Sequence, residues 1–223
     1  MIVAVDGPVA AGKGTLAQRL ARQLGFAYLD TGLLYRAVGA RLLAGGADPA
    51  DAVAAAVVAG QIDAGDLARP DLRSEAVGEA ASQAAAHPGV RAALLAFQRD
   101  FAAHPPGGRG AVLDGRDIGT VVCPEADAKL FISASDEARA ERRHRELLAR
   151  GEAANLADVL ADLRRRDARD RQRAMAPLRP APGAHLLDTT GMSIEAAFAA
   201  ALQIVSVQLL KHARGVQEPS RRS

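Results

Sequence analysis

The stretch Gly7-Pro8-Val9-Ala10-Ala11-Gly12-Lys13-Gly14-Thr15 decides the fold. An apolar, β-branched run at residues 2–5 precedes it and predicts a buried strand, and residues 15–24 carry a leucine every fourth position, which predicts a helix. Glycines between a strand and a helix let backbone N–H groups turn toward an anion, and the helix N-terminus adds positive potential there. Lys13 supplies a mobile positive charge, so the stretch predicts a loop that binds the phosphates of a nucleotide.

Short apolar strands alternate with helices along the rest of the chain, which predicts an α/β fold with a parallel five-stranded sheet and helices on both faces. Gly25 is placed to end the first helix. The other expected strands lie at residues 27–29, 111–113, 129–132 and 185–187. The other expected helices lie at residues 33–43, 49–58, 74–86, 90–103, 135–150, 156–173 and 193–210, with loop from the end of the 49–58 helix to residue 70.

Composition narrows the possible functions. The 223 residues are 49% hydrophobic and 24% charged, which is typical of a globular protein, and the net charge of +2 is too small to indicate a polyanionic partner. The single Cys123 excludes an intrachain disulfide and a cysteine zinc site, and it suits a reducing compartment. The five histidines show no metal-binding spacing, so we expect no protein-built metal site.

The N-terminus predicts no signal peptide, because it has no basic segment and reaches an aspartate at position 6. The longest purely apolar run, residues 52–59, is far shorter than the roughly 20 residues of a membrane span. We therefore expect a soluble cytoplasmic monomer with no membrane and no nucleic-acid partner.

The residue after Lys13 is unusual for a phosphate loop. Gly14 stands where a Ser or Thr commonly provides a magnesium ligand, and the hydroxyl of Thr15 comes one position later. This Gly-Lys-Gly-Thr form resembles nucleoside-monophosphate kinases. We expect Mg²⁺, the cofactor of such a reaction, to be held mainly by ATP phosphates and water.

Further motifs resemble one family, the bacterial cytidylate kinases. Their anchors stand in the family's order from residue 2 to about residue 205. The strongest are the phosphate loop itself, Asp30-Thr31-Gly32 with Tyr35-Arg36, the run from Asp114 to Thr120 (DGRDIGT), and the run from Arg166 to Arg173 followed by Ala176-Pro177-Leu178. Weaker agreement is found at Ala81-Ser82-Gln83, Val90-Arg91 and Leu187-Asp188-Thr189-Thr190.

The resemblance implies phosphoryl transfer from ATP to CMP or dCMP in a P-loop NTPase-type fold. It implies that residues 7–15 bind ATP and that the acceptor nucleotide is held by Thr31, Arg36, Ser82, Arg91, Arg116, Asp117, Arg166, Asp170 and Arg173. It also implies a single kinase domain with a core at about 1–30, 106–138 and 174–213. An acceptor-binding part at about 31–105, a lid at about 140–170 and a flexible tail at 214–223 complete that domain. The family often carries a longer insert with a small extra sheet in the acceptor-binding part. In this sequence we expect that insert to be shortened or helical.

The chemistry of these residue types agrees with the resemblance. An acceptor phosphate is already an anionic nucleophile, so transfer needs positioning and charge neutralisation, for which arginine is well suited. A carboxylate can accept from the amino group of cytosine, while Arg and Ser can donate to its ring acceptors. Asp114 follows a strand and can order magnesium-bound water. The residues expected to act in catalysis are Lys13, Asp114, Arg116, Asp117, Arg166 and Arg173. Arg142 and Arg143 are weaker candidates for phosphate contact, and Arg164, Arg165, Arg169 and Arg171 are expected to be surface or structural residues.

Three other interpretations remain open at this point. The chain could be a P-loop kinase for another small acceptor, such as a different nucleotide. It could bind nucleic acid through the arginine-rich residues 139–179, although that stretch has no aromatic residue to stack on bases. It could also be a nucleotide-controlled switch, although such proteins carry Ser or Thr directly after the lysine.

Overall fold

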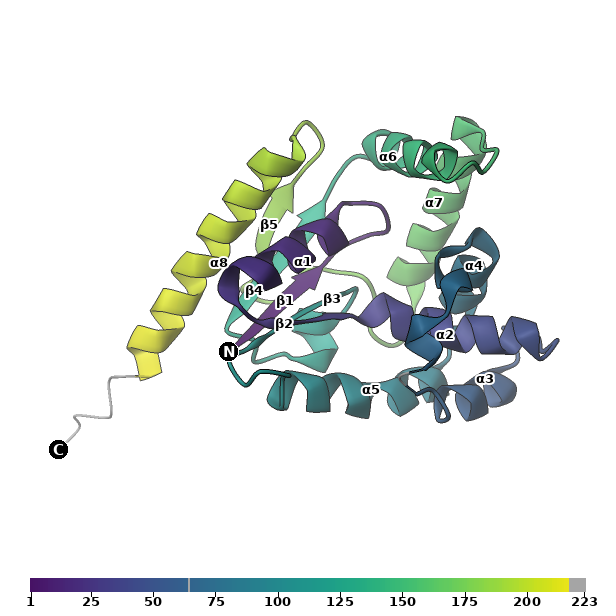
Figure 1. The fold of residues 1–223 in the computed structure, drawn as a ribbon, viewed down its shortest axis with the longest axis horizontal. Helices are drawn as coiled ribbons and strands as arrows, with labels where there is room; N and C mark the ends of the chain where they lie inside the picture. Colours follow the sequence, from purple (N-terminus) through teal and green to yellow (C-terminus); the bar gives the residue numbers. More distant parts are fainter. Residues whose placement is uncertain (64, 217–223) are drawn as a thin grey trace.

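The computed structural model describes residues 1–63 and 65–216, with side chains described through residue 212. Its centre is a sheet of five parallel strands in the order β2-β3-β1-β4-β5 (Figure 1). The strands are β1 (Ile2–Asp6), β2 (Ala27–Asp30), β3 (Ala111–Gly115), β4 (Ala128–Ser133) and β5 (His185–Asp188). The predicted α/β fold with helices on both faces of the sheet is therefore confirmed.

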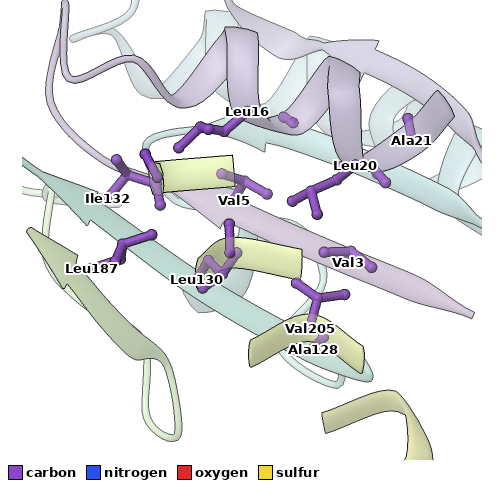
Figure 2. Close-up of a cluster of buried hydrophobic side chains, with 14 of the residues drawn as sticks. Val3, Val5, Leu16, Leu20, Ala21, Ala128, Leu130, Ile132, Leu187 and Val205 are labelled. Atoms are coloured by element: carbon purple, nitrogen blue, oxygen red, sulfur yellow. The ribbon is translucent and has the colours of Figure 1, made fainter. Parts of the chain in front are cut away.

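One face of the sheet is covered by α1 (Lys13–Leu24) and α8 (Ile194–Val216). Figure 2 shows this core, in which Leu16 and Leu20 of α1 meet Val3 and Val5 of the central strand β1. Gly25 ends α1 in the left-handed conformation, as the sequence predicts. Since side chains of a strand alternate between the two faces, the intervening Ala4 points to the opposite side of the sheet.

The other face is covered by α5 (Pro88–Ala103) and by the short helical segment η3 (Ile118–Val122), which the sequence analysis did not predict. Ile118 and Val122 pack beside Leu113 of β3, and the buried, free Cys123 completes this cluster. The thiol is therefore part of the core, as expected of a structural cysteine.

A group of helices follows β2, namely α2 (Thr31–Ala44), α3 (Ala52–Ala59) and α4 (Glu75–Ala84). The helix predicted from residue 49 begins later, because the Asp51 carboxylate accepts from the N–H groups of residues 53 and 54 and caps α3. The predicted loop before residue 70 contains a short 3₁₀ turn, η1 (Asp66–Ala68), and a second turn, η2 (Pro70–Arg73), follows it. Among the described residues between α2 and α4 there is no strand, so this region is helical, as expected.

Two charged helices, α6 (Asp136–Ala149) and α7 (Leu156–Gln172), pack against each other beyond the end of β4 (Figure 1). Ser135 caps α6 and Asn155 caps α7 through their side-chain oxygens. Gly151 lies in the connection with a φ of 76°, which glycine adopts without strain.

Helix α8 extends to Val216, past the end predicted at residue 210, and the remainder of the predicted tail, 217–223, lies outside the described residues. Among the described residues, one helical segment, Ile194–His212, is long and apolar enough to cross a membrane when judged by length and composition alone. Of this segment, 22% is buried. Its buried positions Ala197, Ala201, Val205 and Leu209 recur every fourth residue and face the sheet, which is the pattern of an amphipathic helix on a protein core.

The carboxyl ends of the strands gather the polar residues. Asp30 of β2 stands in register with Asp114 of β3, and Asp6 of β1 stands in register with Gly115. The chain crosses from β1 to β2 on one side of the central strand and continues to β4 on its other side. Ligands of open α/β sheets bind at such a switch point, at the carboxyl edge.

Candidate active site

The predicted phosphate loop occupies the connection from β1 to α1. Gly7 has no room for a side chain, because a Cβ there would lie 2.1 Å from the carbonyl oxygen of Ile132. Ala10 has a φ of 58°, an uncommon backbone conformation for a residue with a side chain, and Gly12 has a φ of 85° immediately before α1. The loop thus turns sharply at the N-terminus of α1, where the helix dipole favours an anion.

Lys13 opens α1 among charged neighbours. Burial, and next the positive charge of Arg116, lower the pKa of its ammonium to about 8, although the carboxylates of Asp114 and Asp30 oppose this shift. A partly buried cation with this low a pKa is stabilised when negative charge is added beside it. The electrostatics therefore favour an anionic ligand at the loop.

Asp114 explains the glycine that follows Lys13. A Cβ on Gly14 would lie 3.1 Å from Asp114 Oδ2, so the aspartate fills the space beside residue 14. The hydroxyl of Tyr28 donates to the same oxygen over 3.3 Å. Burial, and next the adjacent Asp30, raise the pKa of Asp114 to about 7. Asp114 and Asp30 thus place two neighbouring carboxylates beside Lys13. A cation bound there would relieve the repulsion between them.

A pocket beside the loop collects all nine residues predicted to hold the acceptor: Thr31, Arg36, Ser82, Arg91, Arg116, Asp117, Arg166, Asp170 and Arg173. They come from α2, α4, α5, the segment after β3, and α7 with its C-terminal end. Val9 of the phosphate loop also lines this pocket, so the pocket opens onto the loop.

The arginines of this pocket are crowded. Burial, and next the neighbouring charges of Arg166 and Arg143, lower the pKa of Arg36 to about 10. Burial likewise lowers the pKa values of Arg166 and Arg173. The buried Nε of Arg173 has no hydrogen-bond partner among the described residues. Clustered guanidinium groups with an unused donor form a site for an anion such as phosphate.

Carboxylates hold several of these arginines in place. Arg91 and Asp117 form a buried ion pair, and Arg91 also donates to the Ala85 carbonyl over 3.3 Å. Asp170 accepts from Arg116 over 3.2 Å and forms a second ion pair with Arg173. The pocket therefore has a pre-arranged set of charges at two places, one around Asp117 and one around Asp170.

A second pocket lies on the other side of the phosphate loop. Ala10, Ala11 and Gly12 line it together with residues of α1, of α6 and of the stretch from the end of β5 into α8, namely Thr15, Leu16, Arg142, Arg143, Arg145, Glu146, Thr189, Met192, Ser193, Ile194 and Ala197. Arg142 donates to the Thr189 hydroxyl over 3.1 Å and to the Thr189 carbonyl. The two weaker arginine candidates thus line this second pocket, and Arg143 also forms an ion pair with Glu75 of α4.

The sequence analysis missed several residues of this region. Asp6 is buried, and its carboxylate accepts from the N–H groups of Ile118 and Gly119 over 2.7 and 2.8 Å, while burial raises its pKa to about 6. It ties the start of the phosphate loop to the segment that carries Asp117. The proximity of Asp6 to the loop in sequence was visible, but its partners, more than a hundred residues away, were not.

Arg139 is a second missed residue, and its side chain is 1% exposed. It donates to the Val9 carbonyl over 3.0 Å and to Asp167 Oδ2 over 2.6 Å, and it pairs with Asp136. It therefore links α6 and α7 to the phosphate loop. The arginine-rich sequence gave no signal that would have separated it from its exposed neighbours.

The four arginines expected to be surface or structural residues differ from one another. The side chains of Arg164, Arg165 and Arg171 are 56%, 68% and 60% exposed. Arg169 is 28% exposed and donates to Ser82, a residue of the first pocket. That arginine therefore has a direct contact with the candidate site.

Comparison with known proteins gives a consistent result. The family model for cytidylate kinase matches residues 3–207. A cytidylate kinase of Paramagnetospirillum magneticum is 62% identical over 92% of this chain and 97% of its own length, and one of Rhodospirillum rubrum is 58% identical over 92% and 97%. A solved structure, that of TT1252 from Thermus thermophilus, is 24% identical, with a TM-score of 0.46 over 94% of this chain and 97% of that chain.

Proposed function

The chain belongs to the cytidylate kinase family and transfers a phosphoryl group from ATP to CMP or dCMP, and we propose that its two pockets hold these two nucleotides on either side of the phosphate loop. The pocket of α6 and Thr189 takes ATP, with its phosphates on residues 7–15. The arginine-lined pocket takes the acceptor. The observation that supports this most strongly is the shared loop, since Val9 lines one pocket and Ala10 to Gly12 line the other.

The chemistry needs no general base in this arrangement. An oxygen of the acceptor phosphate forms a bond to the γ-phosphorus while the bond from that phosphorus to the β,γ-bridging oxygen breaks, which leaves ADP and CDP or dCDP. Lys13 neutralises charge on the transferred group and on the leaving phosphate. Arg36, Arg116, Arg166 and Arg173 hold the acceptor phosphate and neutralise the charge that develops between the two nucleotides.

The buried pair of Arg91 and Asp117 is suited to recognise the base. The Asp117 carboxylate accepts from the 4-amino group of cytosine, and its ion pair with Arg91 holds that carboxylate in place. Uracil carries an oxygen at the same position, which a carboxylate would repel. Thr31, whose hydroxyl donates to the Asp114 carbonyl over 2.7 Å, fixes the nearby end of the acceptor pocket.

Magnesium fits the oxygen donors beside Lys13. Asp114 and Asp30 offer hard carboxylate ligands with shared negative charge, and among the described residues no group of three or more His, Cys, Asp or Glu forms a metal cage. Mg²⁺ commonly keeps several waters and binds through one or two carboxylates and phosphates. We expect these aspartates to hold its waters, and when bound the ion supplies charge stabilisation to the ATP phosphates.

We expect the helices α6 and α7 to act as a lid and the helices α2 to α5 to close on the acceptor, around a core of the sheet with α1 and α8. Closure would exclude water and so protect ATP from hydrolysis. We also propose that the protein is a monomer and that it is cytoplasmic, where a free, buried cysteine is typical. Light scattering of the purified protein should then give a mass of about 23.1 kDa.

An acceptor panel tests the proposal. Purified protein is incubated with Mg·ATP and one of CMP, dCMP, UMP, AMP or GMP, and ADP release is followed by a coupled assay. Strong preference for CMP and dCMP is expected. Comparable activity with AMP or UMP would contradict base recognition by Asp117 and favour a kinase for another acceptor. ADP formation that does not depend on any acceptor would instead favour the nucleotide switch.

A further inference from the structure

Arg169 lies on α7 and was expected to be a surface or structural residue, but its guanidinium reaches helix α4. Its Nη1 donates to Ser82 Oγ over 2.7 Å, and its Nη2 donates to Glu79 Oε1 over 2.7 Å. Gln83 donates to the same Glu79 oxygen over 3.0 Å. Two neighbours of Ser82 on α4 thus hold the guanidinium in one orientation against the serine hydroxyl.

This contact biases the role that the hydroxyl plays toward the bound nucleotide. A guanidinium has only donors, so Ser82 Oγ must act as the acceptor toward Arg169. The hydroxyl has one proton, and in the part of the chain that the structure describes no acceptor receives it. Because Ser82 lines the acceptor pocket, that proton is available to a hydrogen-bond acceptor on the bound nucleotide.

The position of Ser82 on α4 shows where this donor lies in the pocket. Near its start, a Cβ on Gly78 would lie 2.3 Å from Arg166 Nη2 and 2.9 Å from Arg36 Nη2, so this turn faces the phosphate-binding arginines. At its C-terminal end, the Ala85 carbonyl accepts from Arg91, the partner of Asp117. Ser82 lies on the turn between them, one residue from Ala81, which also lines the pocket. It is therefore within one helical turn of the group that recognises the base.

We propose that Arg169 is a positioning residue that fixes Ser82 as a hydrogen-bond donor toward the pyrimidine, and that this favours cytosine over uracil. Ring nitrogen N3 of cytosine is an acceptor, whereas N3 of uracil carries a proton. A serine hydroxyl that is free to rotate can serve either base, because it can donate or accept. With one of its two lone pairs engaged by a positively charged guanidinium, the hydroxyl becomes a better donor and a poorer acceptor, which favours cytosine. This inference rests on the proposed placement of the acceptor nucleotide.

Comparison of CMP with UMP tests the inference. We would measure kcat/KM for CMP, dCMP and UMP in the wild type and in R169M, S82A and the double variant. The matched control is R165M on the same helix, since Arg165 is exposed and pairs only with Asp162 among the described residues. Thermal melting of every variant verifies folding.

The expected result is a fall in the CMP to UMP ratio of about 5- to 10-fold in R169M, from the loss of one directed hydrogen bond. Much of this change should come from better use of UMP. In the S82A background, R169M should change the ratio by less than about 2-fold, because Arg169 acts through Ser82. The variant E79Q, which retains Arg169 but weakens its anchor, should lie between R169M and the wild type, and R165M should match the wild type.

A purely structural role would lower kcat/KM for all three acceptors alike, and an unchanged CMP to UMP ratio in R169M would overturn the inference. A change confined to the ratio of CMP to dCMP would also overturn it, since the hydroxyl would then face the sugar. These outcomes are separate from failure of the proposed function, which would appear as an absence of CMP preference in the wild type itself.

Discussion

Replacement of Arg139 by Met should severely destabilise the protein. The side chain is 1% exposed, and its removal leaves Asp167, itself 3% exposed, without its partner at 2.6 Å and with only the exposed Arg171 at 3.8 Å. The other carboxylate oxygen of Asp167 already lacks a partner among the described residues. Breaking a buried pair from one side costs about 3–5 kcal/mol, which is a large part of a typical stability of about 5–15 kcal/mol. For a chain of this length the melting temperature should fall by roughly 6–20 °C.

The double variant R139M/D167L separates the ion pair from simple loss of packing. It removes the isolated carboxylate, so it should recover at least about 2 kcal/mol of the stability lost in R139M. Recovery should be incomplete, because the carbonyls of Val9 and Ala134 still lose their donor. Urea unfolding followed by far-UV circular dichroism suits a chain that has no tryptophan. The control R164A, at an exposed ion pair, should cost less than about 1 kcal/mol. A loss in R139M no greater than in R164A, or a double variant no more stable than R139M, would refute the argument.

Four further predictions concern the reaction. K13A should lower kcat at least ~10²-fold, equivalent to about 2.7 kcal/mol of barrier; unchanged turnover would remove the phosphate-loop assignment. D117A should raise the half-saturating concentration of CMP more than the dissociation constant of ATP, measured by titration, and equal losses would indicate misfolding instead. R173A should lower kcat by ~10² or more, as for other arginines that stabilise transferred phosphoryl groups; a change only in acceptor half-saturation would make Arg173 a plain binding residue. Because burial and Asp30 raise the pKa of Asp114 to about 7, its water-ordering ionised form is lost as the pH falls through that value. The kcat/KM for ATP should therefore fall on the acidic side of about pH 7, and this dependence should be absent in D114N; an identical acidic limb in the variant would assign it to another group.

The fold was predictable because its signals are local. The strands are short apolar runs, and α1 carries a leucine at every fourth position up to Gly25 at its end. Periodicity does not report which strands pair, however, and the order β2-β3-β1-β4-β5 emerged only from the structure. The register that places Asp30 beside Asp114 was for the same reason invisible in the sequence.

The candidate acceptor residues were predictable as a set through resemblance, and the structure brings all nine to one pocket. Their individual partners were not predictable, because those partners lie far away in the sequence. The segment η3 was also missed, since its position depends on two hydrogen bonds to Asp6 of β1. A hydrogen bond between such distant residues produces no recognisable pattern in the sequence around either residue.

The arginines of residues 139–179 show most clearly where a single sequence stops being informative. These arginines look alike in the sequence. In the structure, however, Arg139 is buried whereas Arg164 is exposed, and Arg169 contacts α4 whereas Arg165 pairs with Asp162 of its own helix. What distinguishes them is the element that packs opposite each helical face. Arg139 contacts the phosphate loop and Arg169 contacts Ser82 of the proposed acceptor pocket, so the helix pair α6 and α7 contacts both proposed nucleotide sites at once. A movement of this pair would therefore change the loop and the acceptor pocket together, which is the coupling that transfer between two bound nucleotides requires.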